Sequence, residues 1–104
     1  MIFFISYDIS DDKRRLRLSN LLLQSGCQRV QKSVFFASDF GRHEMLRLKS
    51  RIEKLLTVQY TEGVSLDDSV LYIPLDNDAL ADVVWQGEKE KWIGLIKKDN
   101  LKFF

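Results

Sequence analysis

The sequence is poor in the side chains that close disulfides or bind soft metals. Cys27 is the only cysteine among 104 residues, so the chain can form neither an internal disulfide nor a thiolate metal cluster. We expect Cys27 to be a small, buried apolar residue. His43 is the only histidine, and its place at the start of a predicted helix favours a surface residue over a general base.

Long apolar runs are also missing. No run approaches the roughly 18 residues of a membrane-spanning helix, and the first residues read directly into a strand-like segment without the features of a signal peptide. With one proline, 45% hydrophobic and 30% charged residues, the composition is that of a folded protein. We therefore expect a cytoplasmic protein with one small hydrophobic core.

Positive and negative charges are concentrated in different halves of the chain. Residues 1–61 hold 11 Lys or Arg against 6 acids, a net charge of +5, whereas residues 62–104 hold 5 against 9, a net charge of −4. Between Lys13 and Lys32 there are six basic residues and no acid. Such a run is either a solvated surface or the binding surface for a polyanion.

The apolar patterns predict an α+β fold. We expect strands over residues 2–8, over two short pieces within 28–37 and over 69–75, with helices from about 11 to 25 and from 42 to 57. Ser10 or Asp11 would cap the first helix, and Gly26 would end it. Pro74 makes the strand over 69–75 an edge strand. Beyond it we expect a short strand within 82–87 and another at 101–104.

This β-α-β-β-α-β order is typical of a ferredoxin-like sandwich, in which two helices cover one face of a four-stranded antiparallel sheet. We assign residues 1–87 to this domain and residues 88–104 to a C-terminal tail that packs on a dimer partner. Both faces of strand 2–8 are apolar, so the face without helices predicts a second copy. Leu16 and Leu23 lie off the core stripe of the first helix and also need a cover.

Several motifs, in order and at characteristic spacings, resemble the CRISPR-associated protein 2 family over nearly the whole chain. They are the strand ending in Tyr7 and Asp8, the basic helix in "ISDDKRRLRLSNLL", Gly26, "VQKSVF" from Val30 to Phe35, and "DDSVLYIPL". The resemblance implies that Asp8 is the metal ligand and catalytic residue, with Mg²⁺ or Mn²⁺ as cofactor. By position it also assigns active-site places to Tyr7, Arg15, Arg17, Arg29 and Phe35.

The resemblance further implies a homodimer that takes part in spacer acquisition. Family members bind duplex DNA, bridge subunits of the CRISPR-associated integrase, and in some cases cleave RNA or double-stranded DNA. Arg14, Arg15 and Arg17 would contact phosphates, because arginine forms bidentate contacts with them, and we expect little dependence on base sequence.

Four alternatives remain open at this point. Asp8 could simply end its strand and accept hydrogen bonds from the next turn, while Asp11 and Asp12 serve the helix start. The basic helix could be an ordinary solvated surface. The chain could also be a scaffold without catalysis, or a related ribonuclease toxin that shares the fold and the aspartate at the strand end.

Overall fold

The computed structural model describes residues 2–57, 68–84 and 86–87. Its elements, in chain order, are β1 (Ile2–Asp8), α1 (Asp12–Gln24), β2 (Gln28–Gln31), β3 (Val34–Ala37), α2 (Arg42–Thr57), β4 (Ser69–Leu75) and α3 (Asn77–Ala81). The first six confirm the predicted elements. None of the helices in the described part is long and apolar enough to cross a membrane.

The end of the described chain differs from expectation. Residues 77–81 form the short helix α3, which begins after the N-cap Asp76, and the described residues among 82–87 form no strand. The predicted strand is therefore wrong there. The predicted strand at 101–104 and the tail from residue 88 lie outside the described residues.

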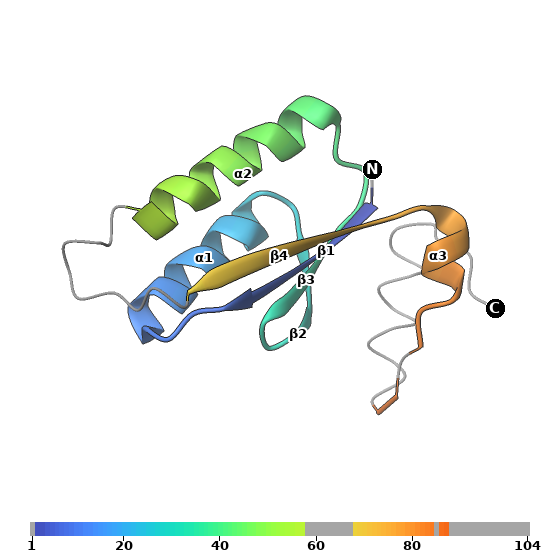
Figure 1. The fold of residues 1–104 in the computed structure, drawn as a ribbon, viewed down its shortest axis with the longest axis horizontal. Helices are drawn as coiled ribbons and strands as arrows, with labels where there is room; N and C mark the ends of the chain where they lie inside the picture. Colours follow the sequence, from blue (N-terminus) through green and yellow to red (C-terminus); the bar gives the residue numbers. More distant parts are fainter. Residues whose placement is uncertain (1, 58–67, 85, 88–104) are drawn as a thin grey trace.

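The sheet has the strand order β2-β3-β1-β4, and every neighbouring pair is antiparallel. This is the ferredoxin-like order, with β1 in the centre, and α1 and α2 lie side by side on one face of the sheet (Figure 1). Pro74 lies in the edge strand β4, opposite Phe3, where its missing N–H costs no bond in the sheet interior.

The ends of α1 follow from local chemistry. The Asp11 carboxylate accepts a hydrogen bond of 3.0 Å from the backbone N–H of Arg14 and caps the first turn. The helix ends at Ser25, and Gly26 follows with φ +93°, a left-handed conformation that only glycine adopts readily. The chain then enters β2 directly.

The main core lies between the sheet and the two long helices. Alternation along β1 points Phe3, Ile5 and Tyr7 into this layer. The side chains with almost no exposed surface in this core include Ile5, Leu18, Leu22, Phe35 and Ile52. Cys27 is also buried there, as expected, and burial raises the pKa of its thiol to about 11, so the thiol is neutral at physiological pH.

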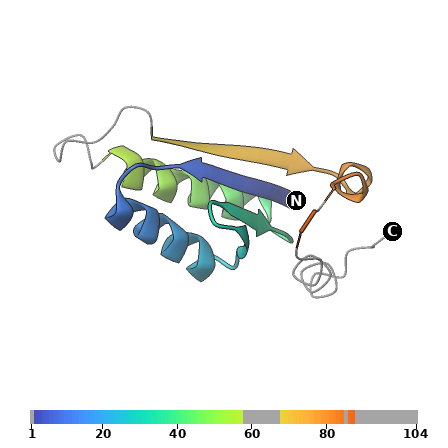
Figure 2. The ribbon, with the colours of Figure 1, turned by 90° about the horizontal axis from the view of Figure 1, so that it is seen from below.

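The opposite face of the sheet is only partly covered. Val30, Phe36 and Leu80 form a second buried cluster there, so α3 shields the part of the face near the end of β4 (Figure 2). Leu71 and Ile73 of β4 keep 60% and 40% of their surface exposed. Within the described part of the chain, the predicted bare apolar face therefore remains only where α3 does not reach.

Two adjacent leucines on α1 test this description of the core. Leu22 is fully buried and Leu23 is 50% exposed. Leu22→Ala should lower the free energy of unfolding by about 2–5 kcal/mol, because it removes apolar contacts and leaves a cavity. Leu23→Ala should change it by less than about 0.5 kcal/mol. Urea unfolding of both variants measures the difference, and equal losses would contradict this packing.

Candidate nucleic-acid and metal site

Asp8 ends the central strand with its carboxylate in solvent. It is exposed and lies opposite Ser69 of β4 in the strand register. Because side chains alternate along a strand, Asp8 shares a face with Phe4 and Ser6, away from the two long helices. Among the residues that the structure describes, no hydrogen bond or ion pair engages the Asp8 carboxylate. The alternative in which Asp8 accepts hydrogen bonds from the following turn is therefore not what the structure shows.

Tyr7 and Phe35 lie beneath the surface on the helix side of the sheet. Their side chains belong to the main core, and the two rings stack with centroids 6.1 Å apart. The Tyr7 hydroxyl donates a hydrogen bond of 3.3 Å to the carbonyl of Lys32. Within a single chain, Tyr7 and Phe35 pack in the core, and the Tyr7 hydroxyl holds the β2–β3 turn. Both side chains are buried, so a nucleic acid cannot reach them directly.

Arg29, which the resemblance assigns to the same site as Tyr7 and Phe35, is exposed. Its guanidinium lies 5.1 Å from the centroid of the Phe35 ring, in a cation–π contact that crosses from β2 to β3. Arg29 is exposed, so it remains available to a phosphate.

The three arginines at the start of α1 differ in their exposure and in their partners. Arg14 forms a salt bridge of 2.9 Å with Asp68, and the two side chains are only 5% and 6% exposed. Arg15 pairs with Asp12 on the surface. Arg17 is exposed. The prediction that Arg14 contacts nucleic acid thus meets a physical obstacle, because Arg14 would have to leave a buried partner first.

Asp68 joins three segments around the end of β1. Besides the bond from Arg14, its carboxylate accepts hydrogen bonds from the backbone N–H and the hydroxyl of Ser10, at 3.0 and 3.1 Å. Burial raises the pKa of Asp68, but these hydrogen bonds and the nearby Arg14 charge outweigh burial, so the pKa lies below its usual value. Asp68 therefore fastens the β1–α1 loop, which follows Asp8, to the start of β4.

The sequence patterns gave Asp68 no role. It stands in the quoted stretch "DDSVLYIPL", directly before the strand residue that faces Asp8. Only its position before an edge strand could have indicated a role for Asp68. That indication is weak, because an acid at such a position is usually solvated.

One copy of the chain supplies only part of a metal site. No group of three or more His, Cys, Asp or Glu side chains with metal-binding geometry occurs in residues 2–57, 68–84 and 86–87. Mg²⁺ takes six oxygen ligands and often keeps several waters, so one carboxylate with solvent access suits it as a single ligand. Asp8 fits that role. A second protein carboxylate would have to come from another molecule or from outside the described part.

Comparison with known proteins shows which family the chain belongs to. The family model described as CRISPR associated protein Cas2 matches residues 1–83. The chain belongs to the Cas2 family. It is 34% identical over 87 residues to the CRISPR-associated endoribonuclease Cas2 3 of Synechocystis sp., which covers 84% of this chain and 85% of that protein. It is also 58% identical to the CRISPR-associated endoribonuclease Cas2 of Aeropyrum pernix over 33 residues, 32% of this chain and 36% of that protein.

Solved structures agree on the fold. The crystal structure of Streptococcus pyogenes Cas2 at pH 6.5 matches with a TM-score of 0.66 and 24% identity, over 84% of this chain and all of that chain. A hypothetical protein from Thermus thermophilus matches with a TM-score of 0.57 and 32% identity, over 72% of this chain and 80% of that chain. The ferredoxin-like fold predicted from the sequence is thus confirmed.

The Arg14–Asp68 pair predicts a marked pH dependence of stability. Asp68→Asn should lower the free energy of unfolding by about 3–5 kcal/mol at pH 7, because it leaves Arg14 buried without a counter-charge. Since the pKa of Asp68 is depressed in the folded state, its contribution is complete above the unfolded pKa of about 4 and is lost as the pH falls through the folded pKa. Below the folded pKa of Asp68, wild type and variant should therefore have similar free energies of unfolding.

Urea unfolding between pH 7 and pH 3 measures this convergence. Asp12→Asn is the matched control, because Asp12 also pairs with an arginine of α1 but its side chain is 89% exposed, so it should cost little at any pH. A cost for Asp68→Asn as small as that of the control would show that the pair does not hold the loop.

Proposed function

We propose that this Cas2 family chain acts as a homodimeric, Mg²⁺-dependent endonuclease on RNA or duplex DNA. The observation that carries the proposal is the free Asp8 carboxylate at the end of the central strand, on the sheet face that the long helices leave open. A metal site needs a carboxylate that no protein cation has neutralised, and Asp8 meets this condition within the described residues. The names of the relatives, which call them endoribonucleases, support the reaction class.

A second copy would complete the site. Leu71 and Ile73 remain exposed on the face that carries Asp8, and burial of such a patch favours two-fold association. A two-fold axis near the end of β1 would bring the two Asp8 carboxylates together. A divalent ion held between them would lower the pKa of a bound water and offset the charge of the scissile phosphate.

The side chains around Asp8 then have separable tasks. Asp8 binds the metal, and the exposed cations Arg17 of α1 and Arg29 of β2 attract the phosphate backbone. Asp68 and Ser10 hold the loop after Asp8 in place through the hydrogen bonds described above. Binding through phosphates depends steeply on salt and little on base sequence.

Replacement of Asp8 by Asn tests the enzyme. Asp8→Asn keeps the size of the side chain but removes the negative charge that Mg²⁺ requires, so metal-dependent cleavage should fall to background while the fold persists. Asp11→Asn is the control, because asparagine caps helices as well as aspartate does, and it should retain cleavage. RNA and duplex DNA are incubated with each protein in Mg²⁺, Mn²⁺ or EDTA. Cleavage that survives in Asp8→Asn would come from another site or from a contaminant.

A second candidate function is a scaffold in spacer acquisition that binds duplex DNA and bridges integrase subunits without cleaving anything. The specific observation in its favour is that the described residues of one copy hold no cluster of metal ligands. Absence of cleavage by wild type under every metal condition, together with retained DNA binding and capture of purified CRISPR integrase, would decide for the scaffold.

Both candidates require a dimer. One chain has a mass of 12.2 kDa, so sedimentation of the purified protein at micromolar concentration should give a species of twice that mass. Leu71→Lys should shift it towards the monomer, because it places a charge on the exposed apolar face, whereas Lys13→Glu on α1 should not. A monomer for wild type at that concentration would refute the shared-metal arrangement.

A further inference from the structure

The free positive charge of the helix layer lies mainly on α2. Two of the four cations of α1 already have acidic partners, Arg14 with Asp68 and Arg15 with Asp12. Helix α2 carries five Lys or Arg against two Glu, and none of the five forms a salt bridge within the described chain. Among the described residues, α2 therefore carries more positive charge without an acidic partner than α1 does.

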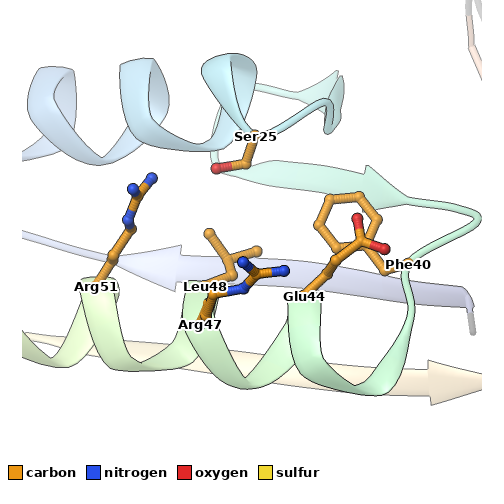
Figure 3. A pocket seen from close by; sticks show the side chains of 6 residues that line it. All are labelled: Ser25, Phe40, Glu44, Arg47, Leu48 and Arg51. Atoms are coloured by element: carbon orange, nitrogen blue, oxygen red, sulfur yellow. The ribbon is translucent and has the colours of Figure 1, made fainter.

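A crevice separates the C-terminal end of α1 from residues 44–51 of α2. Its volume is about 180 Å³, and its lining consists of Ser25, Phe40, Glu44, Arg47, Leu48 and Arg51. In Figure 3 the Arg51 side chain extends from α2 towards α1, and the Arg47 guanidinium lies between Arg51 and Glu44. Two guanidiniums thus border one small cavity.

The two arginines are not needed to cap α1. Three of the last four carbonyls of that helix, those of residues 21 to 23, already accept hydrogen bonds from the backbone N–H groups of Ser25, Gly26 and Cys27 at 3.0–3.1 Å. The Ser25 hydroxyl donates a further bond of 2.7 Å to the Leu21 carbonyl. Arg47 and Arg51 are also four residues apart on one helix, a spacing at which like charges repel. An anion between them would relieve that repulsion.

We propose that this crevice binds a phosphate group, held by Arg47 and Arg51. Guanidinium groups match the geometry of phosphate oxygens and donate paired hydrogen bonds to them. Glu44 is the one carboxylate in the lining, and it weakens anion binding by repulsion. The inference rests on the proposed function only for the source of the phosphate, which is the backbone of a bound nucleic acid. It adds a phosphate contact on α2, apart from Asp8.

The first experiment uses inorganic phosphate and the full chain. Thermal unfolding is followed as phosphate replaces chloride at constant ionic strength, for wild type, Arg47→Ala/Arg51→Ala and the control Arg42→Ala/Lys54→Ala. The control removes the same charge from the same helix outside the crevice and corrects for the general stabilisation by phosphate. Wild type and control should gain more in melting temperature than the crevice variant, and Glu44→Gln should gain most. Equal gains in all four proteins would overturn the site.

The second experiment measures affinity for duplex DNA and for RNA over a range of salt concentrations. The crevice variant should bind several-fold more weakly, and its slope of log affinity against log salt should be flatter by about 1. The control pair should lose less than half as much. Equal losses of affinity in the crevice variant and the control variant would show that the charge of α2 acts without a specific site, and would overturn the proposed phosphate site.

The two experiments separate this inference from the proposed function. Phosphate binding that needs Arg47 and Arg51, without any binding of nucleic acid by wild type, would sustain the crevice and refute the nucleic-acid function. Nucleic-acid binding by wild type and crevice variant alike, together with equal gains from phosphate in all four proteins, would sustain the nucleic-acid function and refute the crevice.

Discussion

The buried ion pair between Arg14 and Asp68 is the interaction on which the region around Asp8 depends. Removing two charges from water costs several kcal/mol per ion, and a pair offsets that cost only when its remaining hydrogen-bonding groups are satisfied. Here the Asp68 carboxylate accepts three hydrogen bonds, two from Ser10 and one from Arg14. The arrangement is specific, because no other described segment brings donors to that carboxylate.

This pair also explains why the end of β1 has a defined position. Asp8 is the last residue of the strand and its side chain is exposed, so no packing against the described residues holds it in place. The residues on either side of it are fixed instead: Tyr7 by its core contacts and its backbone bond of 3.0 Å to the carbonyl of Ser33, and Ser10 by Asp68. An exposed carboxylate between two anchored neighbours can meet a metal with little loss of backbone entropy.

The sequence predicted those elements whose signal is local and periodic. The spacing of Met45, Leu48 and Ile52 predicted α2 with its observed ends, and the turn residues around Lys32 and Ser33 separated β2 from β3. Gly26 ended α1 because the chain needs a left-handed residue there. Each of these features is determined within a few residues, so pattern and local propensity suffice.

The features that the sequence did not predict depend on distant partners. Arg14 looked like its exposed neighbours, because its partner Asp68 is 54 residues away. Tyr7 and Phe35 were assigned to the site through the family resemblance, whereas the structure places both rings in the core. Helix α3 is five residues long, too short for a periodic signal, and it forms where Leu80 can cover Phe36 and Val30. Such contacts require the fold to be known first.

The distribution of free charge has a consequence for how a polyanion would lie on the molecule. On the functions proposed above, Asp8, on the face away from the long helices, would repel phosphate until a cation is bound, whereas the excess of basic residues on α2 would attract phosphate without a metal. A nucleic acid that binds without metal should therefore settle on the helix layer, and only a metal-loaded site would draw it towards Asp8. If both proposals hold, phosphate binding on α2 and metal-dependent chemistry at Asp8 would occupy opposite faces of one sheet. A scaffold role through α2 and a nuclease role through Asp8 would then rest on different side chains of the same chain.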